Sequence, residues 1–160
     1  MDARRTPDDQ EVITSVDLQK VMMPPRLPGV KSCPFTRRII VVYEPFAGLG
    51  TSSNNIAVVW NESVTGRNID DISCSAYWSF FKMERDAKSF ILWGDNCSAQ
   101  DKNRTFFSFL ATAVNSQDIS ADEITFKYLK SSHTFTAADS VHHNIERELK
   151  KCGDVRDFQV

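Results

Sequence analysis

The sequence has few cysteines and no cysteine pair of the kind that holds structural zinc. Its four cysteines, Cys33, Cys74, Cys97 and Cys152, are far apart, and no C-x-x-C pair occurs. No histidine stands beside them at the spacing of zinc ligands. We therefore expect reduced, mostly buried thiols in an intracellular protein, and no structural zinc site.

Long hydrophobic runs and sequence repeats are also missing. No apolar run approaches the roughly 20 residues that cross a membrane. The N-terminus carries Asp2, Arg4 and Arg5, which is unlike a signal peptide. There is no internal repeat and no low-complexity tract. These absences predict a chain that does not interact with membranes.

An excess of basic residues is missing as well. The formal net charge is -2 at pH 7, whereas a nucleic-acid-binding domain usually carries a basic patch. This charge argues against a nucleic-acid partner unless the acids cluster in a metal site, where bound cations reverse the local field. The 160 residues suffice for one domain with a core of its own. We expect residues 1–10 to be disordered and residues 11–160 to form that domain.

The apolar pattern predicts five strands and three helices in the order β-β-β-α-β-α-β-α. Strands are predicted from β-branched and alternating runs, and helices from apolar residues at helical spacing. The expected strands are residues 11–17, 37–46, 54–63, 89–95 and 123–130. The first helix should follow a cap at Asp70–Asp71, and its expected inner face is Ile72, Ala76, Phe80 and Met83. The expected inner face of the second helix is Phe106, Phe107, Leu110 and Val114. The third helix should span about 137–151, with Val141, Ile145 and Leu149 on its inner face.

The order of these elements predicts an α/β fold. The proline-rich stretch from Met22 to Pro34 cannot be regular structure. The second and third strands suggest a hairpin, because the link between them contains glycines. The run 89–95 is almost continuously apolar, which suits a strand buried on both faces in a parallel pairing. We therefore predict a mixed sheet covered by helices, with the first strand between the second and the fourth.

Two acids end predicted strands, Asp17 and Asp95. Carboxylates on adjacent strands would lie about 4.8 Å apart and would repel each other unless cations neutralised them. Mg²⁺ prefers such oxygen ligands, and two ions roughly 3.5–4 Å apart can clamp a phosphodiester during displacement. The simpler interpretation of either acid is a turn former or a helix cap.

The last helix offers a third acid. Asp139, His142 and Glu146 lie along one side of it, next to the apolar stripe. Asp139 and Glu146 are about 10.5 Å apart along the axis, so one metal pair should not use both. Asp139 is nearer the strand ends, and Glu146 is the alternative third ligand. The simpler interpretations are a solvated acid at Glu146 and a polar helix flank at His142 and His143.

Three blocks of the sequence resemble eukaryotic transposon-encoded proteins with a DDE/D, ribonuclease-H-like catalytic domain. The middle block is the most specific. It follows the pattern D-N-C-x-x-Q-N-K-N from Asp95 to Asn103, with Asp101 where the family tends to carry Asn. The first block resembles D-x-Q followed by prolines, and the third resembles H-T followed by an Asp six positions after the His. The matching residues are Asp17, Gln19, Pro24 and Pro25 in the first, and His133, Thr134 and Asp139 in the third.

The resemblance implies a ribonuclease-H-like sheet and a nuclear DNA transposase core. Asp17, Asp95 and Asp139 would be the catalytic residues and would bind two Mg²⁺ or Mn²⁺ ions for strand cleavage and transfer. The partners implied are transposon ends and target DNA, with a homo-oligomer left open. Because such transposases carry a separate DNA-binding region, we expect the chain to be a fragment or a truncated copy of a longer protein.

The polar residues after Asp95 are candidates for contact with DNA. Gln100, Lys102 and Asn103 stand at the start of a predicted helix, and a helix N-terminus attracts phosphate. The simpler interpretation is a helix cap at Asn103 and a solvated Lys102.

Two other functions stay open. A domesticated, catalytically inactive derivative would keep the fold as a DNA- or protein-binding module. Another ribonuclease-H-like nuclease would act on RNA/DNA hybrids or branched DNA.

Overall fold

A computed structural model gives the arrangement of most of the chain. The segment 1–10, for which the sequence predicts disorder, lies outside the residues that the structure describes. The described residues are 11–17, 22–25, 27, 37–50, 54–63, 76–94, 104–129 and 136–152.

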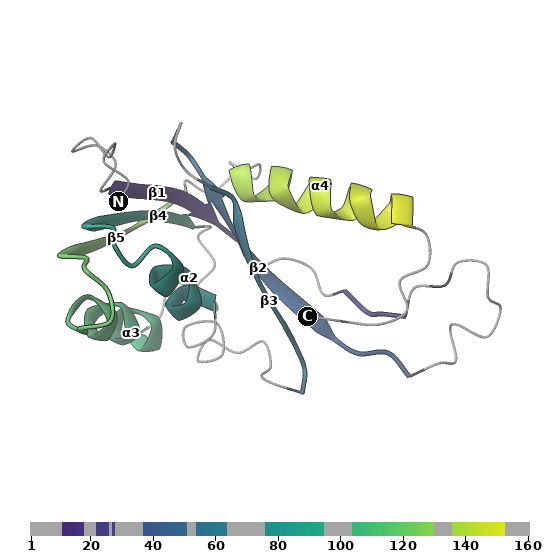
Figure 1. Cartoon of the computed structure of the whole chain (residues 1–160), viewed down its shortest axis with the longest axis horizontal. Coiled ribbons are helices and arrows are strands. Elements are labelled where there is room, and N and C mark those ends of the chain that lie inside the picture. The colour runs from purple at the N-terminus through teal and green to yellow at the C-terminus, as the bar shows by residue number, and fades with distance from the viewer. Residues whose placement is uncertain are drawn as a thin grey trace, which may run out of the picture.

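The fold is α/β, a five-stranded mixed sheet with helices on both faces in a ribonuclease-H-like arrangement (Figure 1). The predicted order of the elements is confirmed. The elements are β1 (Glu11–Val16), β2 (Val41–Gly48), β3 (Ile56–Asn61), α2 (Trp78–Met83), β4 (Ser89–Gly94), α3 (Arg104–Val114), β5 (Glu123–Tyr128) and α4 (Ala137–Cys152).

The strand order in the sheet is β3-β2-β1-β4-β5. β2 pairs antiparallel with β3 and with β1, which confirms the predicted hairpin. β4 pairs parallel with β1 on one side and with β5 on the other. The first strand therefore lies between the second and the fourth, as the sequence predicts.

An aromatic core fills the space between the sheet and the helices α2 and α3. Phe46 of β2 stacks on Phe80 of α2 with ring centroids 4.2 Å apart. Tyr77 meets the edges of Phe46 and Phe106, which joins α3 to the same cluster. Each of these four rings is at most 2% exposed. Packing on this face therefore holds the two short helices to the sheet.

The opposite face of the sheet is covered by α4, which packs over β2 and β1 (Figure 1). Its predicted apolar stripe, Val141, Ile145 and Leu149, is only half-buried. α4 does not cover β4 in the same way, and Ile91 and Trp93 on that side of β4 are also half-buried. The parallel pairing predicted for β4 is confirmed. The prediction that both faces of β4 are buried was wrong for the face on the side of α4.

Three predicted core positions differ in the structure. Met83 is 64% exposed because α2 ends there, and Phe107 is 46% exposed. In α3 the buried residues are Phe106, Leu110 and Ala113, and Phe107 stands about 100° round the helix from Phe106. Cys152 is a free, exposed thiol rather than a buried one. The other three cysteines, the predicted cap at 70–71 and Ile72 lie outside the described residues.

The proline-rich stretch contributes no named strand within its described residues, 22–25 and 27. Met22 forms an isolated bridge with Val41, and the amide of Ile39 donates to the carbonyl of Pro24 at 3.0 Å. The stretch therefore runs beside the beginning of β2, in agreement with the irregular structure expected for it.

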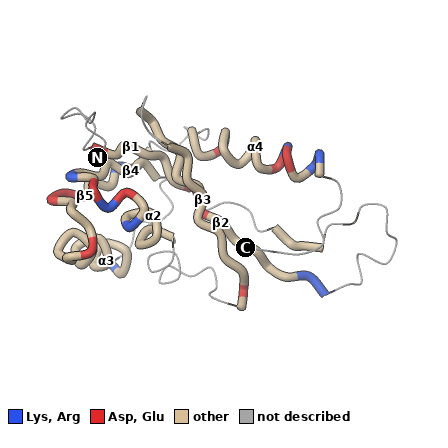
Figure 2. Tube along the Cα trace, in the orientation of Figure 1, with Lys and Arg blue, Asp and Glu red and all other residues tan. Residues whose placement is uncertain are grey.

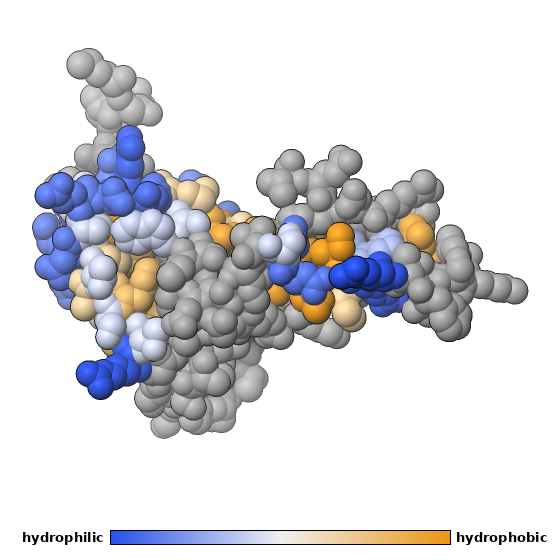
Figure 3. Space-filling model, turned by 90° about the horizontal axis from the view of Figure 1, so that it is seen from below, coloured by the Kyte–Doolittle hydropathy of each residue, from blue (hydrophilic) through white to orange (hydrophobic). Residues whose placement is uncertain are grey.

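The described surface carries exposed charges of both signs. Basic and acidic residues are interspersed along the chain (Figure 2). Seen from below, hydrophilic residues gather at one end of the molecule, and hydrophobic and hydrophilic ones mix at the other (Figure 3). Exposed Ile39 and Ile40, for example, directly follow exposed Arg37 and Arg38. No described helix is long and apolar enough to cross a membrane.

Two neighbouring phenylalanines of α3 test this packing. We expect Phe106→Ala to lower the free energy of unfolding by about 3–5 kcal/mol, because it opens a cavity beside Tyr77 and Phe126. Phe107→Ala is the matched control and should cost less than about 1 kcal/mol, since its ring is half-exposed. Urea denaturation measures both values, and equal losses would contradict this assignment of the core face.

Candidate functional site

Asp17 directly follows β1, at the carboxyl end of the strand, and is half-buried. The register pairs Ser15 with Ala47 of β2 and with Trp93 of β4. Side chains alternate along a strand, so Ser15 and Asp17 fall on the face that also carries Ala47 and Tyr43. That face is the one covered by α4.

Asp139 lies in the first turn of α4 and forms a capping box with Thr136. The amide of Thr136 donates to Asp139 Oδ2 at 2.6 Å, and its hydroxyl donates to the same oxygen at 3.0 Å. In return the amide of Asp139 donates to Thr136 Oγ1 at 3.2 Å. Such a box satisfies amides that the first turn of a helix leaves without partners. Asp139 Oδ1 takes no part in these bonds.

One turn after Asp139, the side of α4 that faces the sheet carries a polar contact. Tyr43 of β2 is 1% exposed, and its hydroxyl is hydrogen-bonded to Nδ1 of His142. The two rings stack with centroids 5.7 Å apart and planes 22° from parallel. Burial, with the nearby Glu146 carboxylate as a second cause, raises the pKa of Tyr43 from 10.0 to about 12.

This contact changes the interpretation of His142. The simpler sequence interpretation, a polar flank of the helix, does not include the contact that half-buried His142 makes with Tyr43. It agrees with His143, which is exposed. Glu146 is half-buried, so it is not the fully solvated acid of the simpler interpretation either. The predicted alignment of Asp139, His142 and Glu146 on one side agrees with their shared partial burial.

Sequence reasoning missed Tyr43. Tyr43 lies in a largely apolar strand, so the sequence pattern predicts only another core residue at this position. The available signal was chemical, because a buried tyrosine hydroxyl usually has a hydrogen-bond partner. Sequence reasoning also missed Glu44, an acidic residue that is only 1% exposed. By alternation it lies between Val42 and Phe46 on the opposite face, so it does not join Asp17.

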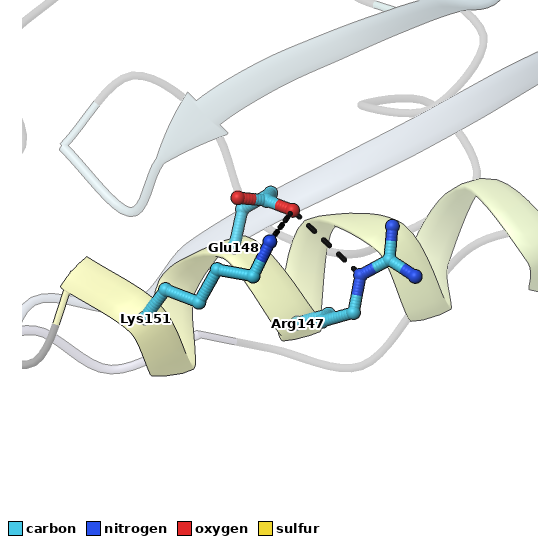
Figure 4. A network of polar contacts seen from close by, with 3 residues as sticks. All are labelled: Arg147, Glu148 and Lys151. Atoms are coloured by element: carbon cyan, nitrogen blue, oxygen red, sulfur yellow. Dashed lines mark hydrogen bonds and ion pairs between the residues drawn. The ribbon is translucent and has the colours of Figure 1, made fainter.

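The last turns of α4 carry a separate, solvent-exposed group of charges (Figure 4). Glu148 lies 2.7 Å from Lys151 and 3.6 Å from the Arg147 guanidinium. Each of these three side chains is more than half exposed. Exposed ion pairs contribute little to stability, so these charges belong to the surface rather than to the site.

The remaining predicted site residues lie outside the described residues. They include Asp95 and the three candidates for DNA contact, Gln100, Lys102 and Asn103. Among the described residues, no group of three or more His, Cys, Asp or Glu side chains is placed to hold a metal ion. The structure therefore describes two of the three predicted catalytic acids, Asp17 and Asp139.

Comparison with known proteins gives one family. The family described as "Domain of unknown function (DUF7869)" matches residues 72–156, more than half of the chain. The chain belongs to this family. The DUF7869 match takes in α2, β4, α3, β5 and the whole of α4, and it contains Asp95 and Asp139 but not Asp17 or Tyr43. No curated protein and no solved structure matches the chain.

The environment of Tyr43 can be tested by alkaline titration. An unfolded tyrosine ionises near pH 10, whereas folded Tyr43 keeps its proton until about pH 12. The unfolded state thus loses this proton first, and the Tyr43 contribution to stability is lost as the pH rises from about 10 to 12.

We expect the tyrosinate absorbance of wild type minus that of Tyr43→Phe to show one group titrating near pH 12. Tyr128→Phe is the control and should leave that phase in place. A difference titration centred near pH 10 would contradict the buried hydroxyl.

Proposed function

We propose that this chain is the catalytic core of a DNA transposase that cleaves and joins DNA strands in the nucleus. Asp17, Asp95 and Asp139 would be the ligands of two divalent cations, Mg²⁺ or Mn²⁺. The substrates would be transposon ends and target DNA. The resemblance of three sequence blocks motivates this proposal, and the arrangement of the described residues supports it.

The observation that carries the proposal is the parallel register of β1 and β4. Ser15 pairs with Trp93, and each of the two residues precedes an aspartate by two positions, Asp17 and Asp95. Parallel neighbouring strands end at the same edge of a sheet, which is where open α/β sheets place their sites. Strands in antiparallel or distant positions would have argued against a shared site.

The chemistry of the described acids fits divalent metal ions. Carboxylate oxygens are the ligands that Mg²⁺ prefers, and both Asp17 and Asp139 are half-buried. Asp139 uses Oδ2 for the capping box, which leaves Oδ1 for another ligand. When bound, the two ions would activate water and stabilise the charge that develops on the phosphate.

The chain itself would position the acids and the DNA. α4, which carries Asp139, packs across β1 and β2. β1 is the strand that Asp17 follows, and β2 is its neighbour in the sheet. α3 begins at Arg104, so Lys102 and Asn103 immediately precede it in the sequence. A helix N-terminus with a nearby lysine is a suitable place for a DNA phosphate. Gln100, Lys102 and Asn103 are accordingly our candidates for contact with the DNA backbone.

Replacing Asp139 by Asn tests the proposed metal role. Asn keeps the shape and one acceptor for the capping box but loses the charge that offsets the cations. We expect Asp139→Asn to abolish Mn²⁺-dependent nicking of supercoiled plasmid, with thermal stability reduced by no more than about 1 kcal/mol. Calorimetric titration with Mn²⁺ should show the same loss of metal binding, as it should for Asp95→Asn.

Glu146→Gln is the matched control on the same side of α4 and should affect nicking far less. The reverse result, with Glu146→Gln inactive and Asp139→Asn active, would make Glu146 the third ligand. Wild type that binds DNA or a protein but cuts nothing with either ion would favour the inactive binding module. Preferential cutting of RNA/DNA hybrids or branched DNA would favour the other nuclease.

The proposed phosphate contact at Lys102 predicts a change in salt dependence. Lys102→Ala should weaken binding to duplex DNA and reduce the slope of log K against log salt by about 0.9, the value for one phosphate contact. Lys88→Ala is the control, because Lys88 precedes β4 at the other end of that strand. Fluorescence anisotropy across a salt series measures both, and an unchanged slope for Lys102→Ala excludes this contact.

A further inference from the structure

The helix that carries Asp139 is held to the sheet by little apolar burial. Of the sixteen residues of α4, only Ala138 is buried, and Val141, Ile145 and Leu149 are half-buried. The area that could be removed from water under such a helix is small, and apolar contacts have no direction. Apolar packing alone therefore leaves the rotation and the sliding of α4 on the sheet weakly determined.

The contact between Tyr43 and His142 has the direction that apolar packing lacks. Tyr43 is buried in β2, and β2 is hydrogen-bonded to β1 on one side and to β3 on the other. Its hydroxyl can therefore move little. Because the phenol has a raised pKa and keeps its proton, it is the donor in its hydrogen bond to Nδ1 of His142. A buried hydroxyl that lost this acceptor would be costly.

The position of this contact relates it to both described acids. His142 follows Asp139 by three residues, about 4.5 Å along the helix axis and on the same side. β2 runs antiparallel to β1, and Phe46 pairs with Val16. Tyr43, three residues before Phe46, therefore lies beyond the carboxyl end of β1, where Asp17 is found.

We propose that the Tyr43–His142 contact is a positioning pair that fixes the first turns of α4 on the sheet and so sets Asp139 relative to Asp17. The metal part of this inference rests on the proposed function, whereas the anchoring of α4 does not. Neither residue would touch the metal ions or DNA. Their effect would pass through the placement of Asp139.

Four single variants of the full chain test the pair. Tyr43→Phe keeps the ring and removes the hydroxyl, and His142→Leu removes the acceptor. His142→Asn places an amide oxygen near the position of Nδ1 and should restore the bond. His143→Leu is the matched control at the exposed neighbouring position.

The first measurement is hydrogen exchange of the backbone amides in α4. We expect Tyr43→Phe and His142→Leu to speed this exchange about five- to tenfold, as the loss of one buried hydrogen bond would. His142→Asn and His143→Leu should stay within about twofold of wild type. In the double variant Tyr43→Phe/His142→Leu the α4 amides should exchange no faster than in either single variant, because both substitutions remove the same contact.

The second measurement is Mn²⁺ affinity by calorimetry. We expect the dissociation constant to rise roughly tenfold in Tyr43→Phe and His142→Leu, as for partners that orient a ligand, and to recover in His142→Asn. Faster exchange with unchanged Mn²⁺ affinity would make the contact structural only and would overturn the positioning role. If wild type binds no Mn²⁺, the proposed function fails and the metal part of this inference fails with it. Unchanged α4 exchange in Tyr43→Phe and His142→Leu would overturn the anchoring itself.

Discussion

The parallel pairing of β1 with β4 is the contact on which the rest of the structure depends. It joins the antiparallel β1-β2-β3 half of the sheet to the parallel pair of β4 and β5. The two strands are distant in the sequence, with β2, β3 and α2 between them. In this pairing, Ser15 lies beside Trp93, and the ends of β1 and β4 share one edge of the sheet.

The two faces of the sheet are stabilised in different ways. On one face, closely packed aromatic rings bind α2 and α3 to the strands, and this packing supplies most of the buried apolar surface. On the other, α4 lies over β2 and β1 with a half-buried stripe and one polar contact. A firmly packed face and a lightly held helix are compatible with the site proposed beside that helix. The first face provides stability, and the second leaves room for side chains with other chemistry.

Asp139 illustrates how one residue can have two roles. Its Oδ2 closes the capping box with Thr136 and so helps to begin α4. Its Oδ1 is left over for another ligand in the proposed function. A local role in the helix does not compete with a ligand role, because the two use different oxygens.

The sequence by itself determined the element order, the mixed sheet and the strand that Asp17 follows, because apolar periodicity and turn residues are local properties. It also singled out Asp139 through a motif, and the family match at residues 72–156 includes α4. It did not determine which faces are covered. The exposure of Met83 depends on where α2 ends, that of Phe107 on how α3 is turned toward the sheet, and the half-burial of one face of β4 on where α4 lies. Nor did the sequence reveal Tyr43 and His142 as partners. They are 99 residues apart in the chain, and only the packing of α4 across β2 brings a buried hydroxyl to an imidazole nitrogen.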